Sequence, residues 1–427
     1  MNMLKTIAQA WKIAEIRKKM IFTFLMLVIF RLGSCIPVPG IDRAQLAGMF
    51  DANEAGLFGL FDLFSGGSFS NFTIFALSIT PYITASIILQ LLTIAIPKLE
   101  EIAKEGTEGR KKIAQYTRYL TVVLALVQAI GYTFGLFRQV VSDNSILSRV
   151  VIILTLCAGT AFLMWLGEQI NDKGIGNGIS LIIFAGIVDR IPRGITGTWS
   201  AYQDGTVSLV SIILFLLFAV VVIVGIVLVQ EGQRKIPVQY AKRVVGRKMY
   251  GGQSTHIPIK VNQAGVIPVI FAISLLQLPL TITYIWPNTG FAVWVAKWLS
   301  PNGNPGVWIY VVLDVLLIIA FTYFYTAITF NPQEIADNMK ANGGFIPGIR
   351  PGRPTVEYLS KVMTRITLVG AIFLAVIAAM PTLLQQWTNL SIGFGGTSLL
   401  IAVGVALDTM KQLETQMVMR NYSGFLK

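Results

Sequence analysis

The stretch LVSIILFLLFAVVVIVGIVLV, from Leu209 to Val229, contains no charged side chain in 21 residues. About 20 consecutive, mostly apolar residues in an α-helix are needed to cross the hydrocarbon core of a bilayer. This stretch therefore predicts a transmembrane helix, and with it a membrane protein.

Nine other stretches of the chain have the same character, although several are shorter. Their apolar runs are continuous, whereas a membrane β-barrel would show alternating segments of about ten residues. The sequence therefore predicts an all-α, polytopic membrane protein with ten transmembrane helices. The ten predicted spans are residues 20–37, 71–96, 116–137, 150–168, 179–192, 207–229, 265–285, 308–329, 363–384 and 396–410.

The composition of the whole chain agrees with this class. Of 427 residues, 54% are hydrophobic and only 13% are charged, and the mean hydropathy is +0.67. A soluble protein of 46.8 kDa needs more polar surface than that. The chain nevertheless carries a net charge of +13, so its basic residues must be concentrated somewhere.

The distribution of basic residues predicts the orientation in the membrane. Segments on the N-terminal side of the spans hold 27 of the 34 lysines and arginines, and segments on the other side hold six. Arg31, within the first span, completes the total. Because basic loops stay in the cytoplasm and ten is an even number, we expect both termini to be cytoplasmic. No small-residue cleavage site follows the basic N-terminus, so we expect no cleavable signal peptide.

Side chains that carry chemistry are scarce. Cys35 and Cys157 lie in apolar runs, which favours buried thiols over a disulfide framework. His256 is the single histidine, which removes most metal sites and the catalytic arrangements that need a histidine inside the membrane. The glycine pattern Gly174–Gly178 lacks the lysine and the strand of a phosphate-binding loop and predicts a turn. We therefore expect no enzymatic activity, no metal and no cofactor.

Two predicted cytoplasmic loops, about residues 230–264 and 330–362, are longer than a connection requires. The first holds seven basic residues and one acid, Glu231, and the second is rich in glycine and proline around Arg350 and Arg353. One interpretation is that the charge orients the protein and attracts anionic lipids. The other is that the loops bind a large acidic or RNA-containing partner.

The ten spans divide into two halves, residues 1–192 and 193–427, which predicts two pseudo-symmetric, inverted units around a central pore. In this division the fifth and tenth spans are the two shortest, and the second and seventh both contain proline: Pro81, Pro268 and Pro279. Proline frees backbone groups that only protein or a water-filled cavity can satisfy, so both correspondences indicate a central pathway. An inverted-repeat secondary transporter of a small solute or ion is the main alternative function.

The residues available to line that pathway are mainly apolar. Ionisable residues within the spans are few and scattered, and they form no chain that resembles a proton relay. Arg31 should have a partner at membrane depth, but the sequence does not identify it. The second, fifth, seventh and tenth spans instead offer isoleucines, either as ordinary packing residues or as the lining of the pathway: Ile79, Ile83, Ile183, Ile270 and Ile401.

A short apolar segment after the first span, LFGLFDLFSGG at Leu57–Gly67, cannot cross a membrane. Its phenylalanines recur at helical spacing, and glycines follow them, so a short helix is expected. It either caps the outer surface or folds back into the bundle.

Many motifs along the chain resemble those of the bacterial SecY family, the central subunit of the Sec protein-conducting channel. The resemblance runs from the first span to the tenth and includes loops as well as helices. The motifs are residues 33–42 (GSCIPVPGID), 64–67 (FSGG), 79–87 (ITPYITASI), 105–119 (EGTEGRKKIAQYTRY), 164–170 (MWLGEQI), 174–180 (GIGNGIS), 253–257 (QSTHI), 331–338 (NPQEIADN) and 348–352 (GIRPG).

The resemblance implies a passive channel in the bacterial plasma membrane, with cytoplasmic termini, that conducts unfolded secretory polypeptides and releases membrane segments laterally. The five isoleucines above would form a pore ring. The segment about 57–71 would be a plug, and Gln128 and Asn262 would be polar residues of the lateral gate. The plug residues would include Leu57, Phe58, Leu60, Phe61, Phe64, Ser65, Gly66 and Gly67.

The resemblance also implies partners. The channel would be clamped by SecE, usually with SecG, and driven from outside by the SecA motor ATPase or the ribosome. Its substrate would be a polypeptide bearing a signal sequence, and direct DNA binding is not expected. The residues implied in docking are Arg350, then Arg243, Arg247, Lys248 and Tyr422.

Overall fold

The computed structural model describes residues 3–42, 45–46, 66–138, 140–141, 143, 145–205, 208–240, 243–245, 248–250, 254–285, 289–300, 306–388 and 396–424. Most of these residues are helical. The helices are α1 (Met3–Lys12), α2 (Ala14–Gly33), α5 (Thr80–Ala95), α6 (Pro97–Lys104), α7 (Thr107–Gly131), the π-helix η1 (Tyr132–Leu136), α8 (Ile146–Lys173), α9 (Gly178–Gln203), α10 (Leu209–Glu231), α11 (Ile267–Ile285), α12 (Gly290–Trp298), α13 (Gly306–Thr329), α14 (Pro332–Ala341), α15 (Arg353–Thr388) and α16 (Gly396–Gly424).

A helix occupies each of the ten predicted spans, which confirms the all-α polytopic fold. Five of the described helices are long and apolar enough to cross a membrane, and α5 with α6 makes a sixth if that pair, bent by 102°, is one span. Of the others, α2, α9 and α16 contain charged residues beside their apolar runs, and α11 is apolar but short. The number of ten crossings therefore stays a prediction.

The prolines of the second and seventh spans lie differently from the prediction. Residues 66–79 form turns, and α5 begins only at Thr80, so Pro81 lies in its first turn. Pro268 likewise follows the first residue of α11, and only Pro279 is inside that helix. Proline suits a first turn, where its missing N–H would have no helical partner. Pro81 and Pro268 therefore start helices rather than interrupt them.

The fifth and tenth spans are not the shortest helices, contrary to the prediction. α9 has 26 residues and α16 has 29, because each helix continues through polar residues beyond its apolar run. The side chain of Asn177 caps α9 by accepting hydrogen bonds from the N–H groups of Ile179 and Ser180.

The predicted loop at 230–264 contains β-structure that the sequence reading did not anticipate. β1 (Gln233–Tyr240) and β4 (Ser254–Lys260) are antiparallel, with Gln233 opposite Lys260, and β5 (Gly344–Phe345) pairs with the other edge of β1. Ile236 and Val238 alternate with exposed neighbours, as expected for a strand with one buried face. They pack against α14 and α15 in a separate small core. The remaining strands are β2 (Arg243–Val245) and β3 (Lys248–Tyr250).

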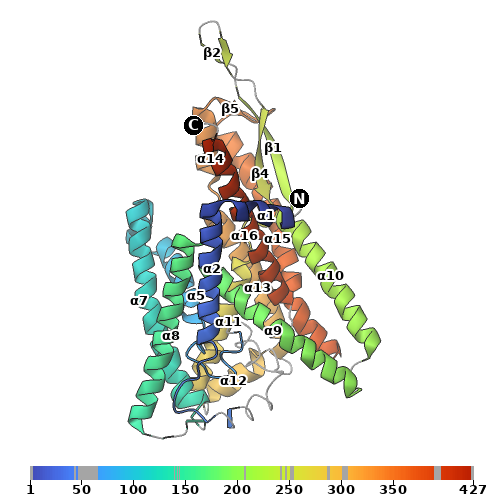
Figure 1. The fold of residues 1–427 in the computed structure, drawn as a ribbon. Helices are drawn as coiled ribbons and strands as arrows, with labels where there is room; N and C mark the ends of the chain where they lie inside the picture. The colour runs from blue at the N-terminus through green and yellow to red at the C-terminus, as the bar shows by residue number, and fades with distance from the viewer. Residues whose placement is uncertain are drawn as a thin grey trace.

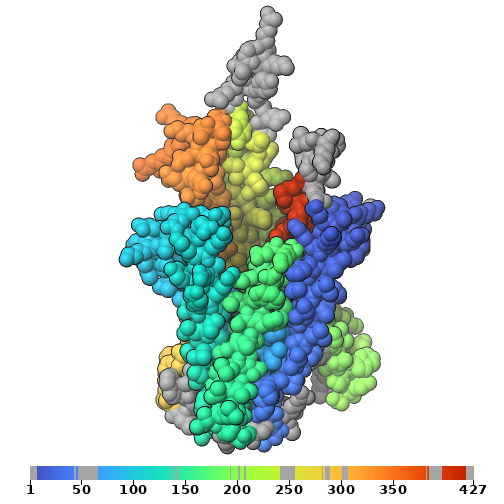
Figure 2. Space-filling model, turned by 60° about the vertical axis from the view of Figure 1, so that its left-hand side comes forward, coloured from blue at the N-terminus to red at the C-terminus, as the bar shows by residue number. Residues whose placement is uncertain are grey.

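The helices run roughly along one axis, and α1 begins and α16 ends toward the same end of the molecule (Figure 1). The β1–β4 hairpin rises beyond that end, whereas α12 lies across the opposite end (Figure 1). At the end that carries the termini, the surface is hollowed between α6–α7 on one side and α1–α2 on the other (Figure 2). Parts of the C-terminal half are visible behind this hollow (Figure 2).

Candidate functional site

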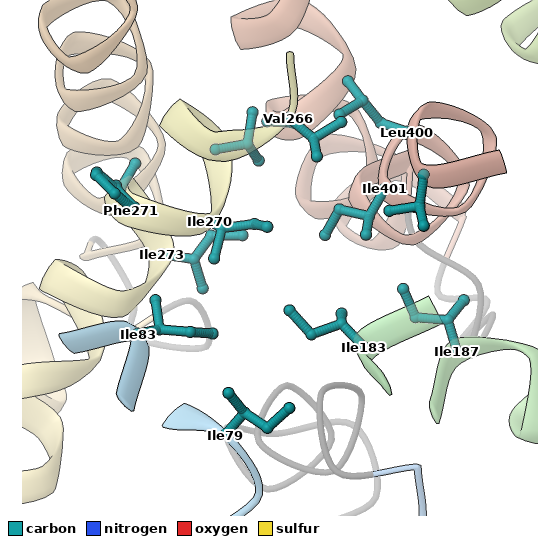
Figure 3. Close-up of a cluster of buried hydrophobic side chains, with 14 of the residues drawn as sticks. Ile79, Ile83, Ile183, Ile187, Val266, Ile270, Phe271, Ile273, Leu400 and Ile401 are labelled. Atoms are coloured by element: carbon teal, nitrogen blue, oxygen red, sulfur yellow. The ribbon is translucent and has the colours of Figure 1, made fainter. Parts of the chain in front are cut away.

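The five predicted ring isoleucines lie together in the largest buried cluster of the described residues. Ile79 precedes α5, Ile83 lies in its first turn, and the other three come from α9, α11 and α16. Figure 3 shows their side chains pointing toward a common centre. Ile83 and Ile270 are 8% and 7% exposed, and the other three are 2% exposed or less. Segments separated by more than 300 residues in the sequence thus converge on one apolar site.

Two helix starts bring the ring together. α5 begins next to Ile79 after a tight turn, in which the N–H of Ser78 donates to the carbonyl of Phe75 and Ser78 has a φ of 53°. α11 begins just before Ile270, after a turn in which Gly265 has a φ of 64° and the Asn262 side chain donates to its carbonyl at 2.9 Å. Both helices therefore begin inside the bundle.

Sequence reasoning missed further members of this cluster. Figure 3 labels five of them close to the ring, all of them apolar. Ile187 is one helical turn after Ile183, so helical periodicity could have found it. Leu400 adjoins Ile401, and periodicity gives no such signal for it. The five are Ile187, Val266, Phe271, Ile273 and Leu400. Side chains of this kind offer no hydrogen bond to whatever passes between them.

Most of the predicted plug, including Leu57, Phe58, Leu60, Phe61, Phe64 and Ser65, lies outside the described residues. Residues 66–71 of the segment are described, and two of them that were named as plug residues, Gly66 and Gly67, have positive φ. A Cβ at Gly66 would lie 2.7 Å from the Cα of Gly186, which adjoins Ile187 of the cluster. The end of the segment thus packs against α9 beside the ring, and only glycine permits this approach.

The two predicted lateral-gate residues occupy different environments. Gln128 is buried on α7, which contacts α11, and α11 also contacts α5. Asn262 is buried in the turn before α11, close to Gly370 of α15, and its described hydrogen bond is local. Gln277, a buried polar residue within α11, was missed, although a glutamine inside an apolar run could have signalled it.

Three of the predicted docking residues, Arg243, Lys248 and Arg350, lie in strands or in the turn after β5. Arg350 is exposed in the turn between β5 and α15, where its carbonyl accepts a hydrogen bond from the Thr355 hydroxyl at 2.9 Å. Arg243 and Lys248 begin β2 and β3, and Arg247 lies outside the described residues. Tyr422 lies near the end of α16.

The structure supplies the partner that the sequence could not assign to Arg31. Its Nη1 lies 2.5 Å from Oδ2 of Asp189, so α2 and α9 are joined by an ion pair.

Asp314 is buried on α13, and its Oδ1 has no hydrogen-bond partner among the described residues. The same part of the chain contains no group of three or more potential metal ligands.

A sequence profile of the SecY family matches residues 73–410, which covers the ring and both helix starts. The chain belongs to the SecY family. It is 49% identical to the protein translocase subunit SecY of Streptomyces scabiei and 49% identical to that of Halalkalibacterium halodurans, with full coverage of both chains in each comparison. The secondary-transporter alternative has no support among these relatives.

Solved structures share the fold of this SecY-family chain. A structure described as that of a protein-conducting channel superimposes with a TM-score of 0.69 at 21% identity, covering 94% of this chain and 93% of the other. A second, from work on the plug domain of SecY in the closed channel, gives a TM-score of 0.67 at 20% identity, covering 94% and 92%. Sec61 in a canine ribosome–channel complex gives 0.64 at 20% identity, covering 94% and 93%.

Proposed function

We propose that this SecY-family chain is the protein-conducting subunit of a translocase, and that the isoleucine ring is its constriction. The observation that carries the proposal is the convergence of Ile79, Ile83, Ile183, Ile270 and Ile401 from both halves of the chain on one buried apolar centre. No single segment could form this site alone.

An aliphatic ring suits a substrate whose chemistry changes at every residue. A lining of hydrogen-bonding groups would bind some polypeptide segments and stall others. Isoleucine offers only weak, non-directional contacts, and it can close around an extended chain to restrict the passage of ions. The ring therefore seals without selecting a sequence.

The neighbouring elements supply the remaining parts of the channel. The segment about 57–71 acts as the plug, in keeping with the close packing of Gly66 on α9. The lateral gate opens where α11 meets α5 and α7, near Gln128. Apolar segments of the substrate leave through this seam into lipid, because burial in the bilayer favours them by roughly 25 cal/mol per Å² of apolar surface.

The energy for transport comes from partners. The protein lies in the bacterial plasma membrane with cytoplasmic termini, bound to SecE and SecG, and SecA or the ribosome docks on the loops around Arg350. The exposure of Arg350 on an ordered platform of strands and helices supports this role. A structural neighbour whose title places it in a ribosome–channel complex is consistent with it.

Crosslinking to a stalled secretory chain tests the proposal. Cysteine replaces Ile83, Ile183 or Ile401 one at a time in a variant without Cys35 and Cys157, and the substrate carries a single cysteine in its arrested segment. We expect disulfide-linked products at all three positions and none at Val312, an exposed apolar residue of α13. Crosslinking at Val312 alone would place the route of the polypeptide elsewhere.

A further inference from the structure

A basic cavity of about 270 Å³ lies between β1 and α15. Its lining consists of Arg234 from β1 and Tyr358, Lys361, Val362 and Arg365 from α15. None of these residues belongs to the isoleucine cluster or to the predicted docking residues. The cavity is therefore a feature that the channel function does not account for.

The cavity concentrates positive charge, and none of its lining residues is acidic. Three of its five lining residues are cations, and none of the three forms an ion pair with another described residue. Like charges held close together repel one another, so an anion between them would be stabilised. The two guanidinium groups are suited to phosphate oxygens, and the Tyr358 hydroxyl adds a possible donor.

The cations that α15 contributes to the cavity lie next to an exposed apolar face of the same helix. One helical face that begins with Lys361 and Arg365 continues through exposed apolar residues for three further turns. Since an α-helix rises 1.5 Å per residue, the first of these lies only about 5 Å along the axis from Arg365. The apolar residues are Leu368, Val369, Ile372 and Val376, which are 44–60% exposed.

The neighbouring helix α10 shows the same transition. Arg234 follows the end of α10 by three residues, and α10 contacts α15. On α10 the last exposed apolar residues before that end are Val224 and Leu228, which are 52% and 67% exposed. The cations therefore lie at the level where two lipid-facing surfaces end, which is the level of lipid headgroups.

We propose that this cavity binds the phosphate of an anionic phospholipid from the leaflet on the side of the termini, with the acyl chains along α10 and α15. A free phosphate would meet the same cations but would gain nothing from the apolar surface beneath them. A lipid uses both parts of the site. The proposal depends on the membrane placement of these helices and not on the route of the polypeptide.

Native mass spectrometry of the full-length chain, purified with its complex partners, tests the site. The complex is titrated in detergent with phosphatidylglycerol or phosphatidylcholine, and the bound lipids are counted. In the variant R234Q/K361Q/R365Q we expect the affinity for the tightest phosphatidylglycerol to fall on the order of 100-fold, because each basic residue contributes roughly a fivefold factor. Phosphatidylcholine binding should not change.

Two comparison variants keep the test specific. K98Q/R110Q/K340Q removes the same charge from exposed residues elsewhere on the same side, and it should retain the lipid. Lys361→Arg keeps the charge and should also retain it. The proposal is overturned if the cavity variant binds phosphatidylglycerol normally or if the control variant loses it equally. Displacement of the lipid by millimolar inorganic phosphate, or tighter binding of a polyglutamate peptide at this site, would likewise overturn it.

Discussion

At the scale of single residues, the ring positions depend on what an isoleucine side chain lacks. Ile79 and Ile401 are almost fully buried, and both pack in a cluster of apolar side chains. A seal of this kind closes by dispersion contacts, which are individually weak and therefore easily separated by a passing chain. A polar side chain at a ring position would weaken such a seal, because it would bring water between the closed side chains.

Replacing Ile83 or Ile401 with asparagine should therefore loosen the seal. A buried amide without partners costs about 1–3 kcal/mol, which corresponds to a shift of up to roughly 100-fold toward open or hydrated states. Ion conductance of the reconstituted channel in planar bilayers measures this shift. Val312→Asn on the exposed face of α13 serves as the control, and unchanged conductance in both ring variants would remove the sealing role.

The residue scale also shows which contacts a sequence can reveal. The five ring isoleucines could be predicted because family motifs and apolar runs surround them. The ion pair between Arg31 and Asp189 could not, because 158 residues separate the two and neither residue type specifies its partner. The sequence predicts that Arg31 needs a partner at membrane depth. The packing of α2 against α9 identifies this partner as Asp189.

At the scale of elements, the turn from Val261 to Val266 links β4 to α11 and holds the start of that helix. Two glycines on neighbouring helices allow this turn to lie close. A Cβ at Gly370 of α15 would be 2.6 Å from the carbonyl oxygen of Val261, and one at Gly404 of α16 would be 2.6 Å from the Val266 side chain. The position of Ile270 therefore depends on small residues in α15 and α16.

Gly370→Ala should displace this turn, because a backbone carbonyl cannot rotate away as a flexible side chain can. We expect a loss of stability of about 1–3 kcal/mol, typical of overpacking, together with higher ion conductance. Thermal unfolding of the purified complex and bilayer recordings give the two measurements. Gly197→Ala on α9, where no atom lies within 4 Å, should be neutral or slightly stabilising. Equal behaviour of the two variants would contradict the role of the turn.

Several helix ends and two strands could not be predicted from hydropathy. Apolar runs located a helix in each predicted span, but the polar ends of α9 and α16 and the late start of α5 at Thr80 lay outside that signal. β1 and β4 were missed because only two alternating residues, Ile236 and Val238, distinguish β1 from a basic loop. Their pairing is decided by contacts with α14 and α15, which are distant in sequence.

At the scale of the whole molecule, the proposed docking platform around Arg350 and the isoleucine ring belong to one continuous structure. β4 leads through a single turn into α11, so a load applied to the hairpin reaches Ile270 without crossing a flexible linker. The N–H of Val261 donates to the carbonyl of Gly232, which ties the base of the hairpin to the end of α10. A partner bound outside the membrane can therefore bias the ring mechanically.

Arg350→Glu should abolish most motor-driven export, because it reverses the charge at the exposed turn of the platform. The fold should survive, since the hydrogen bond from Thr355 uses the carbonyl of residue 350 and not its side chain. Preprotein transport into proteoliposomes measures the effect, with Lys340→Glu on α14 of the same platform as the control. Normal transport rates in the Arg350 variant would disprove its docking role.

The starts of α5 and α11 inside the bundle have an electrical consequence. The N-terminal end of a helix carries about half a positive elementary charge, and α5 begins at the ring next to Ile79. At the start of α11 a carboxylate offsets this charge, since a Cβ at Gly265 would lie 3.9 Å from Oδ2 of Asp408. A cation or a hydrated proton that enters the ring is therefore repelled by the dipole of α5, whereas an extended neutral backbone is not. If the ring is the constriction, as proposed, this dipole helps to protect the transmembrane voltage while water briefly wets the ring.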